Sequence, residues 1–275
     1  MSHTTATARH RPPSTPTGNE PAGASRSAAT LAFAWRTVLR IKYVPEQLVD
    51  VIAVPVVFTV MFTYLLGGAL AGSPSAYLHS LLPGTLVMTL VLLTAFAGTG
   101  LRSDLSSGVH DRFQSLPVWR PSPLAGALVG DLGRYLLASA LVLGLGFALG
   151  FRPDGGIGGT LAALGVVLVF AHALSWLWIV VGLSARNVSA VNAVNIGVQF
   201  PLTMASNVFA DPATMPGWLQ PIVEHNPVSY VVTATRGLIH GEATAGDVTR
   251  ALAISVALIV VFLPLSLRKY RTHRA

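Results

Sequence analysis

The sequence contains no Asp, Glu, Lys or Arg between Val51 and Leu101. A helix that crosses about 30 Å of hydrocarbon needs about 20 apolar residues, so this stretch is long enough for two such helices. Over the whole chain, charged residues make up 11% and hydrophobic residues 52%, whereas soluble domains carry about 25% charged residues. The sequence therefore predicts an all-α polytopic membrane protein that lies in a lipid bilayer.

Six apolar segments are long enough to be transmembrane helices. They cover approximately residues 51–70, 81–101, 124–151, 157–183, 188–209 and 248–267. Residues 1–29 are rich in Ser, Thr, Pro and Ala and are interpreted as a disordered cytoplasmic tail. Residues 30–267 then form one transmembrane domain, and residues 268–275 form a basic cytoplasmic tail.

The basic residues predict the orientation. One side of the six-helix topology collects most of them: Arg36, Arg40, Lys42, Arg102, Arg112, Arg120, Arg186 and the tail RKYRTHR. The other side carries Arg152, Arg236 and Arg250 beside five acidic residues. Lys and Arg are retained on the cytoplasmic side, so both termini are predicted to be cytoplasmic. Because the net charge of +7 sits at the ends of apolar runs, it does not indicate a nucleic-acid partner.

Two segments outside the spans have helical patterns. Residues 30–45 are amphipathic and end at Pro45, which predicts an interfacial helix that precedes the first span; a cytoplasmic extension of that span is the alternative. In residues 210–247, Asn226 and Pro227 suit a helix start and Gly241 a helix end. This second helix is too short to cross the membrane. It is either a re-entrant segment on the external side or a helix lying on the outer surface.

The segment from Ser106 to Pro123 interrupts two apolar runs with charge, aromatic residues and prolines. Val109, Phe113 and Leu116 recur at helical spacing, so the segment predicts a short amphipathic helix in a cytoplasmic loop. Its apolar side either lies on the membrane or fits a groove of a cytoplasmic partner.

No catalytic motif is present. The chain lacks cysteine, a phosphate-binding GxxxxGK[ST] loop, HExxH and GxSxG, so neither an enzyme activity nor a metal or cofactor site is predicted on it. Asp131 and Arg134 lie three residues apart in the third span, where they can pair with each other, or Arg134 can pair with Glu46 and Asp50. A structural role is favoured for them.

The fifth span carries a polar stripe. At 100° per residue, five side chains fall within roughly 80° of one helix face: Asn192, Asn195, Gln199, Thr203 and Ser206. The second span carries a milder version: Thr85, Thr89, Phe96 and Thr99. Such stripes face protein or water rather than lipid, either as the lining of a substrate path or as hydrogen bonds between helices. The GxxxG pairs Gly126–Gly130 and Gly146–Gly150 predict close helix packing.

The chain contains two motifs: D-R-F-x-S-L-P in the loop after the second span, and M-P-x-W-L-Q…N-P-V…R-G-L before the last span. The chain beyond residue 30 resembles the type-2 ABC exporter permeases, and within them the daunorubicin-resistance permease group. The resemblance implies a pair of permease subunits, usually a homodimer. It also implies two copies of a separately encoded ATPase that binds ATP and Mg²⁺.

By this resemblance, the loop helix is the coupling helix. Contact with the ATPase is implied for Gly108, Asp111, Arg112, Phe113 and Leu116, and for the interfacial-helix residues Trp35, Arg36 and Arg40. Spans two and five would line the path, and an external gate would involve Pro216, Trp218, Asn226, Pro227 and Arg236. Asp104 occupies the place of an acidic residue often found near the end of the second span in this family.

The function expected from these observations is ATP-driven export of amphipathic small molecules by alternating access. A lipid or glycan exporter of the same superfamily is an alternative. A secondary transporter is another, although no Asp or Glu lies at mid-membrane depth. A third is a membrane immunity protein that transports nothing.

Overall fold

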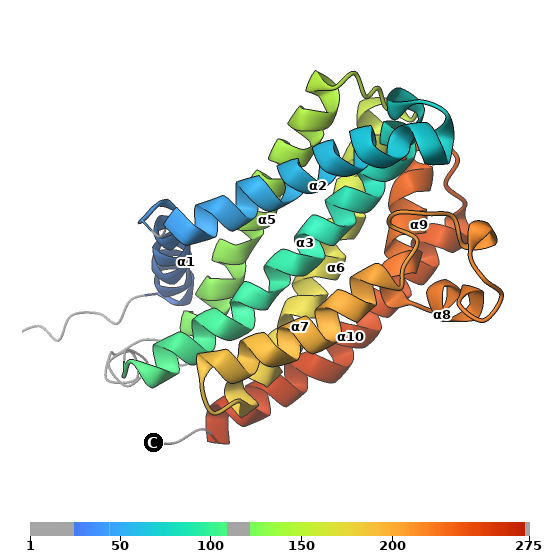
Figure 1. Ribbon diagram of the computed structural model, residues 1–275. Coiled ribbons are helices and arrows are strands. Elements are labelled where there is room, and N and C mark those ends of the chain that lie inside the picture. Colours follow the sequence, from blue (N-terminus) through green and yellow to red (C-terminus); the bar gives the residue numbers. More distant parts are fainter. Residues whose placement is uncertain (1–24, 44, 109–121, 273–275) are drawn as a thin grey trace, which may run out of the picture.

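The computed structural model describes residues 25–43, 45–108 and 122–272, without the side chains of some residues before Pro55. Within these ranges, every regular element is a helix (Figure 1). The elements are α1 (Arg26–Tyr43), α2 (Pro45–Ala71), α3 (Pro74–Ser106), α5 (Ser122–Ala148), α6 (Gly156–Ser184), α7 (Val188–Met204), a 3-10 turn η1 (Pro212–Thr214), α8 (Gln220–Glu224), α9 (Pro227–His240) and α10 (Ala245–Thr272).

Helix α3 forms the centre of the bundle and packs against α2, α5, α6, α7 and α9. Every residue from Leu81 to Val91 is buried, on all sides of the helix. A helix that is apolar all round is typical of a protein core or of a membrane span, and here five neighbouring helices cover it. The second predicted span is therefore the core of the protein and not a lipid-facing element.

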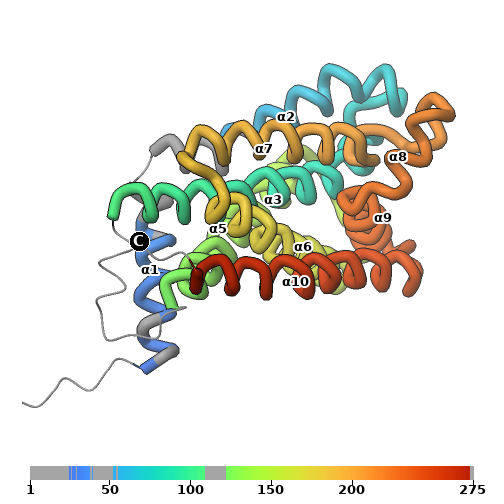
Figure 2. Tube along the Cα trace, turned by 90° about the horizontal axis from the view of Figure 1, so that it is seen from below, coloured from blue at the N-terminus to red at the C-terminus, as the bar shows by residue number. Residues whose placement is uncertain are grey.

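Helix α1 lies across one end of the bundle, at a steep angle to the long helices (Figure 2). It ends before Pro45, as predicted from that proline, and packs against α5. The contact depends on the predicted glycine pair of α5: a Cβ on Gly126 would lie 2.7 Å from the carbonyl oxygen of Thr30, and one on Gly130 would lie 2.8 Å from that of Ala34. Only glycine permits this approach of the two backbones.

The second predicted GxxxG pair is only half confirmed. Gly146 lies tightly against the side chain of Leu82 on α3. Gly150, in contrast, follows the end of α5 with φ +96° and has no atom within 4 Å of a Cβ built on it. The prediction of close packing at Gly150 is wrong because this glycine supplies a left-handed backbone conformation at the turn.

Basic side chains gather at the end of the bundle where α1 lies. Arg102 at the end of α3 donates to the carbonyl oxygen of Arg186 (2.7 Å), between α6 and α7. Lys269 near the end of α10 donates to Ser184 (2.6 Å). The opposite end holds the α2–α3 turn, α8 and α9 (Figure 1). Among the residues whose side chains are described, the division of basic residues that was predicted from the sequence thus corresponds to two opposite ends of the structure.

Four helices of the described chain are long and apolar enough to cross a membrane: α3, α5, α6 and α10. In α2, the described apolar part is the shorter stretch Pro55–Ala71. Helix α7 has 17 residues. Large apolar side chains are exposed along the outer faces of these helices, including Ile196 and Phe200 on α7 and Val260 on α10. Such faces are typical of a protein surrounded by lipid or by a second subunit.

The helix predicted over residues 188–209 ends early, at Met204. Asn226 explains the end, since its Nδ2 donates to the carbonyl oxygens of Leu202 (2.7 Å) and Ala205 (2.6 Å). The same side chain caps α9 as predicted, because its Oδ1 accepts from the backbone N–H of Val228 (2.8 Å). At the other end of α9, Gly241 has φ +77° and closes the helix, also as predicted.

Candidate functional site

A pocket opens between α2, α3 and α7. Its lining comprises Pro55, Thr89, Leu92, Leu93, Ala95, Phe96, Thr99, Asn192 and Asn195. Five of the nine residues in the two predicted stripes therefore meet here: Thr89, Phe96 and Thr99 from α3, Asn192 and Asn195 from α7. The lining contains leucines, an aromatic ring, hydroxyls and amides, and no charged side chain.

Two polar atoms at this pocket have unused hydrogen-bonding capacity. Thr89 and Asn195 are both buried, and neither the hydroxyl of Thr89 nor Oδ1 of Asn195 has a partner among the described residues. A buried acceptor without a donor is costly, and native structures rarely contain one without a water or ligand nearby. The pocket therefore favours a molecule that offers both an apolar surface and N–H or O–H groups.

The other four predicted path residues do not line this pocket. Gln199 bridges two helices: its Nε2 donates to the carbonyl oxygen of Val91 and to the hydroxyl of Thr94 (3.2 Å), both on α3. The hydroxyls of Thr85 and Thr203 donate to carbonyls of their own helices. Ser206 was predicted to lie on the helical stripe, but it follows the end of α7, and its hydroxyl donates to the carbonyl oxygen of Thr203.

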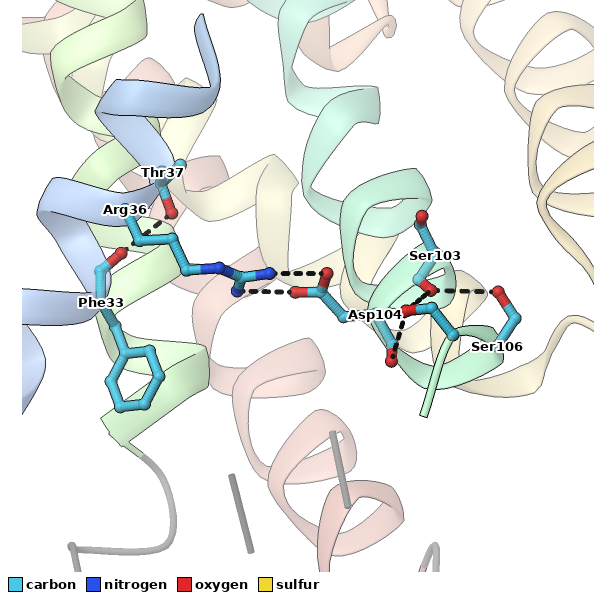
Figure 3. Close-up of polar contacts among 7 residues, drawn as sticks. Phe33, Arg36, Thr37, Ser103, Asp104 and Ser106 are labelled. Atoms are coloured by element: carbon cyan, nitrogen blue, oxygen red, sulfur yellow. Dashed lines mark hydrogen bonds and ion pairs between the residues drawn. The ribbon is translucent and has the colours of Figure 1, made fainter. Parts of the chain in front are cut away.

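The end of α3 is joined to α1 by a bidentate ion pair. Nη1 and Nη2 of Arg36 each lie 3.1 Å from one carboxylate oxygen of Asp104 (Figure 3). Trp35, the next residue, is exposed. Among the predicted coupling residues, Gly108 has φ +68°, so the chain turns directly after α3. Asp111, Arg112, Phe113 and Leu116 lie outside the described residues, as does the side chain of Arg40.

A second ion pair lies deeper in the bundle. Asp131 and Arg134 of α5 pair with each other at 3.1 Å, and both side chains are almost fully buried. The guanidinium of Arg134 lies over the ring of Phe96, 4.9 Å from its centroid. Phe96 thus contacts the buried ion pair and also lines the pocket. Both ion pairs line a further cavity between α1, α3, α5 and α10, which shares Phe96 and Thr99 with the pocket.

At the opposite end, four of the five predicted gate residues fall into two groups, and the fifth, Pro227, is the first residue of α9. Asn226 and Arg236 hold segments together: Arg236 donates to the carbonyl oxygens of Ser80 (3.2 Å) and Asn207 (3.0 Å). Pro216 and Trp218 are exposed in the chain between η1 and α8. Pro55, Leu92 and Leu93 line the pocket but were not predicted from the sequence. Apolar residues in a charge-free helix carry no pattern that distinguishes a pocket wall from a lipid-facing side.

A comparison with known protein families shows to which family this chain belongs. Residues 28–240, from α1 to the end of α9, match the model of the family described as ABC-2 type transporter. The chain belongs to the ABC-2 type transporter family. As a member of this family of membrane permeases, it is a transporter subunit and not itself an enzyme.

The chain is also similar to two permeases along most of its length. The chain is 44% identical to the daunorubicin resistance ABC transporter permease protein DrrB1 of Streptomyces coeruleorubidus, over 94% of this chain and 91% of the relative. It is 28% identical to the probable doxorubicin resistance ABC transporter permease protein DrrC of Mycobacterium tuberculosis (strain CDC 1551 / Oshkosh), over 82% of this chain and 83% of the relative. Both matches extend across most of the ABC-2 fold, including the helices that form the pocket.

Proposed function

We propose that the chain is the transmembrane permease subunit of an ATP-driven exporter that moves amphipathic small molecules, such as drugs or antibiotics, out of the cell. The observation that supports this most directly is the pocket between α2, α3 and α7, with its uncharged polar and aromatic lining. The two relatives are named for resistance to daunorubicin and doxorubicin, which supports substrates of the same chemistry. These relatives favour drug export over lipid or glycan export.

The proposed topology uses six spans: α2, α3, α5, α6, α7 and α10. The concentration of basic residues at the α1 end supports a cytoplasmic location for that end and for both termini. In this arrangement α1 is the interfacial helix. Helix α9 is the re-entrant segment, which is consistent with its burial against α3, α6 and α10. The residues around it, from Pro216 to Arg236, form the external gate.

The energy source in this proposal is a separate ATPase, present in two copies with ATP and Mg²⁺, beneath two copies of the permease. The coupling helix in residues 108–117 and the Trp35–Arg40 part of α1 make the contacts. The ion pair between Arg36 and Asp104 supports this role, because it joins α1 to the last turn of α3. Movement of the coupling loop is thereby transmitted to α3, whose middle turns form one wall of the pocket.

The pocket residues are tested by Asn192→Leu combined with Asn195→Leu. Each substitution removes a polar group that faces substrate, and a hydrogen bond is worth about 0.5–1.5 kcal/mol. We expect roughly tenfold slower efflux of daunorubicin, measured by its fluorescence in cells that express the permease with its ATPase. The same cells should retain normal amounts of permease in the membrane.

Gln199→Leu is the matched control for this experiment. Because Gln199 bonds α7 to α3 and does not line the pocket, its loss should lower the unfolding temperature of the purified permease and leave the efflux rate per folded molecule nearly unchanged. Unchanged efflux in the double asparagine variant would show that the pocket is not on the path.

Coupling is tested by Arg112→Ala and Phe113→Ala. Both variants should insert normally and yet lose export, because ATPase closure would no longer move the permease. The measurement is drug-stimulated ATP hydrolysis of the co-purified complex alongside cellular efflux, and we expect stimulation to fall at least about tenfold, as for a lost interface hot spot. Normal export by both variants would exclude this loop as the coupling element.

Export that persists with a hydrolysis-deficient ATPase but stops when the proton gradient is collapsed would identify a secondary transporter.

A further inference from the structure

Three metal-ligating side chains meet at the end of the bundle opposite α1. His79 lies in the second turn of α3, Asp154 in the turn between α5 and α6, and His240 in the last turn of α9. One potential ligand atom from each residue lies within 4.8 Å of the other two. Three segments far apart in the sequence thus contribute two imidazoles and one carboxylate to one place.

The hydrogen bonds of His240 show which of its two ring nitrogens carries the hydrogen. Its Nε2 lies 3.1 Å from the backbone carbonyl oxygen of His79. A carbonyl oxygen only accepts, so Nε2 carries the hydrogen, and in the neutral ring Nδ1 is an unprotonated acceptor. This Nδ1 faces Oδ2 of Asp154 at 3.4 Å. Two acceptors that face each other need a cation between them, either a proton on the ring or a bound metal ion.

The surroundings are those of a metal site. A ligating histidine usually donates its other N–H to a carbonyl or carboxylate, which fixes the tautomer, and the bond from His240 to the carbonyl of His79 does this. Two histidines and one carboxylate are an established ligand set for zinc and related divalent ions. Nitrogen and oxygen ligands about 2.0–2.2 Å from a tetrahedral zinc ion lie about 3.3–3.6 Å from one another. The pair of His240 and Asp154 already has this spacing, at 3.4 Å, and the three ligand atoms all lie within 4.8 Å of one another.

The backbone around the three residues is held in place independently of any ion. The N–H of Gly155 donates to the carbonyl oxygen of Ile239 (2.8 Å), which ties the α5–α6 turn to the end of α9. Arg236 donates to the carbonyl oxygen of Ser80 (3.2 Å), which ties α9 to the start of α3 beside His79. The ligands are therefore brought together by packing, which lowers the entropic cost of binding an ion.

We propose that His79, Asp154 and His240 bind a divalent transition metal ion of the zinc class, which fastens the end of α9 to the start of α3 and to the α5–α6 turn. The ion takes Nδ1 of His240, a ring nitrogen of His79 and a carboxylate oxygen of Asp154, and water completes its coordination. Because α9 carries Arg236 and is capped by Asn226, the ion stabilises the whole segment between α7 and α10.

The test is zinc binding to the purified full-length permease after treatment with a chelator. We expect one tightly bound zinc ion per chain and a higher unfolding temperature with ZnCl₂ than with MgCl₂. His79→Gln, His240→Gln and Asp154→Asn should each weaken this binding by more than about tenfold and remove the temperature shift. His225→Gln is the matched control, because His225 is an exposed histidine at the same end of the bundle, outside the cluster, and its loss should change neither.

Asp154→Asn keeps the test decisive if a histidine variant does not fold, since the Asp154 side chain is 72% exposed and contributes little to packing. Cobalt(II) supplies a second readout, as its visible absorption should appear in the parent protein and in His225→Gln and be lost in Asp154→Asn. Zinc binding that is equal in the parent and all three variants would overturn the proposal, because the ion would then be held elsewhere. An unfolding temperature of the parent that does not respond to zinc would also overturn it and leave a proton-bridged pair of His240 and Asp154.

Discussion

Arg134→Met is expected to lower the free energy of unfolding by about 3–5 kcal/mol, because it removes a cation that pairs with the buried carboxylate of Asp131. The two side chains are 4% and 5% exposed and lie 3.1 Å apart. Arg134 also lies over the ring of Phe96, and that contact is lost too. The measurement is equilibrium unfolding of the purified permease in mixed micelles, followed by tryptophan fluorescence and compared with the parent protein.

Two further variants test whether the burial of the ion pair causes this loss of stability. Asp131→Leu combined with Arg134→Met removes both charges and should recover most of the lost stability, since replacing a buried pair by apolar side chains is often neutral. Arg36→Met makes the same chemical change in a pair whose side chains are 38% and 22% exposed, and it should cost at most about 1 kcal/mol. An equal loss in Arg36→Met and Arg134→Met would contradict the argument from burial.

These two ion pairs show what the sequence could and could not predict. Asp131 and Arg134 lie three residues apart on one helix, so local geometry was enough to predict mutual pairing as one of two alternatives, and the structure contains that pair. Arg36 and Asp104 are 68 residues apart. Their pairing depends on α1 lying across the end of the bundle, which follows from the glycines of α5. The sequence predicts that such a helix exists but not which charged group it meets.

The polar stripe shows a similar limit. Helical periodicity correctly placed Asn195, Gln199 and Thr203 on one buried face of α7. Gln199 bonds to α3, whereas Asn195 borders the pocket. Periodicity could not distinguish these two roles, because both residues lie on the same face of α7 and differ only in their position along the helix. The sequence prediction also extended this helix to residue 209. The actual end at Met204 is set by Asn226, a capping residue that comes from the next segment of the chain.

The cluster of His79, Asp154 and His240 could not have been predicted at all. Metal motifs that are readable in a sequence place their ligands on one helix or in one loop, whereas these three residues lie in three separate segments. The caps of α9 are the opposite case. An Asn-Pro start and a glycine end act through neighbouring atoms, so both were readable from the sequence alone.

Gly98→Ala and Gly182→Ala are each expected to lower the free energy of unfolding by about 1–3 kcal/mol, because α3 and α6 touch through their backbones at these two residues. A Cβ on Gly98 would overlap the carbonyl oxygen of Trp178, and one on Gly182 would lie 2.5 Å from the carbonyl oxygen of Gly98. The rigid backbones must move apart to admit either methyl group. Gly98→Leu should prevent the folded permease from accumulating in the membrane, as measured by its yield and elution profile.

Gly100→Ala and Gly165→Ala are the matched controls on the same two helices. A Cβ on either glycine has no atom within 4 Å. Alanine in a helix is favoured over glycine by about 0.5–1 kcal/mol, so these variants should be as stable as the parent or slightly more stable. The double variant Gly98→Ala/Gly182→Ala should cost less than the sum of its parts, because one separation of α3 from α6 admits both methyl groups. Stability changes of the same sign and size at all four positions would mean that the helices do not meet at Gly98 and Gly182.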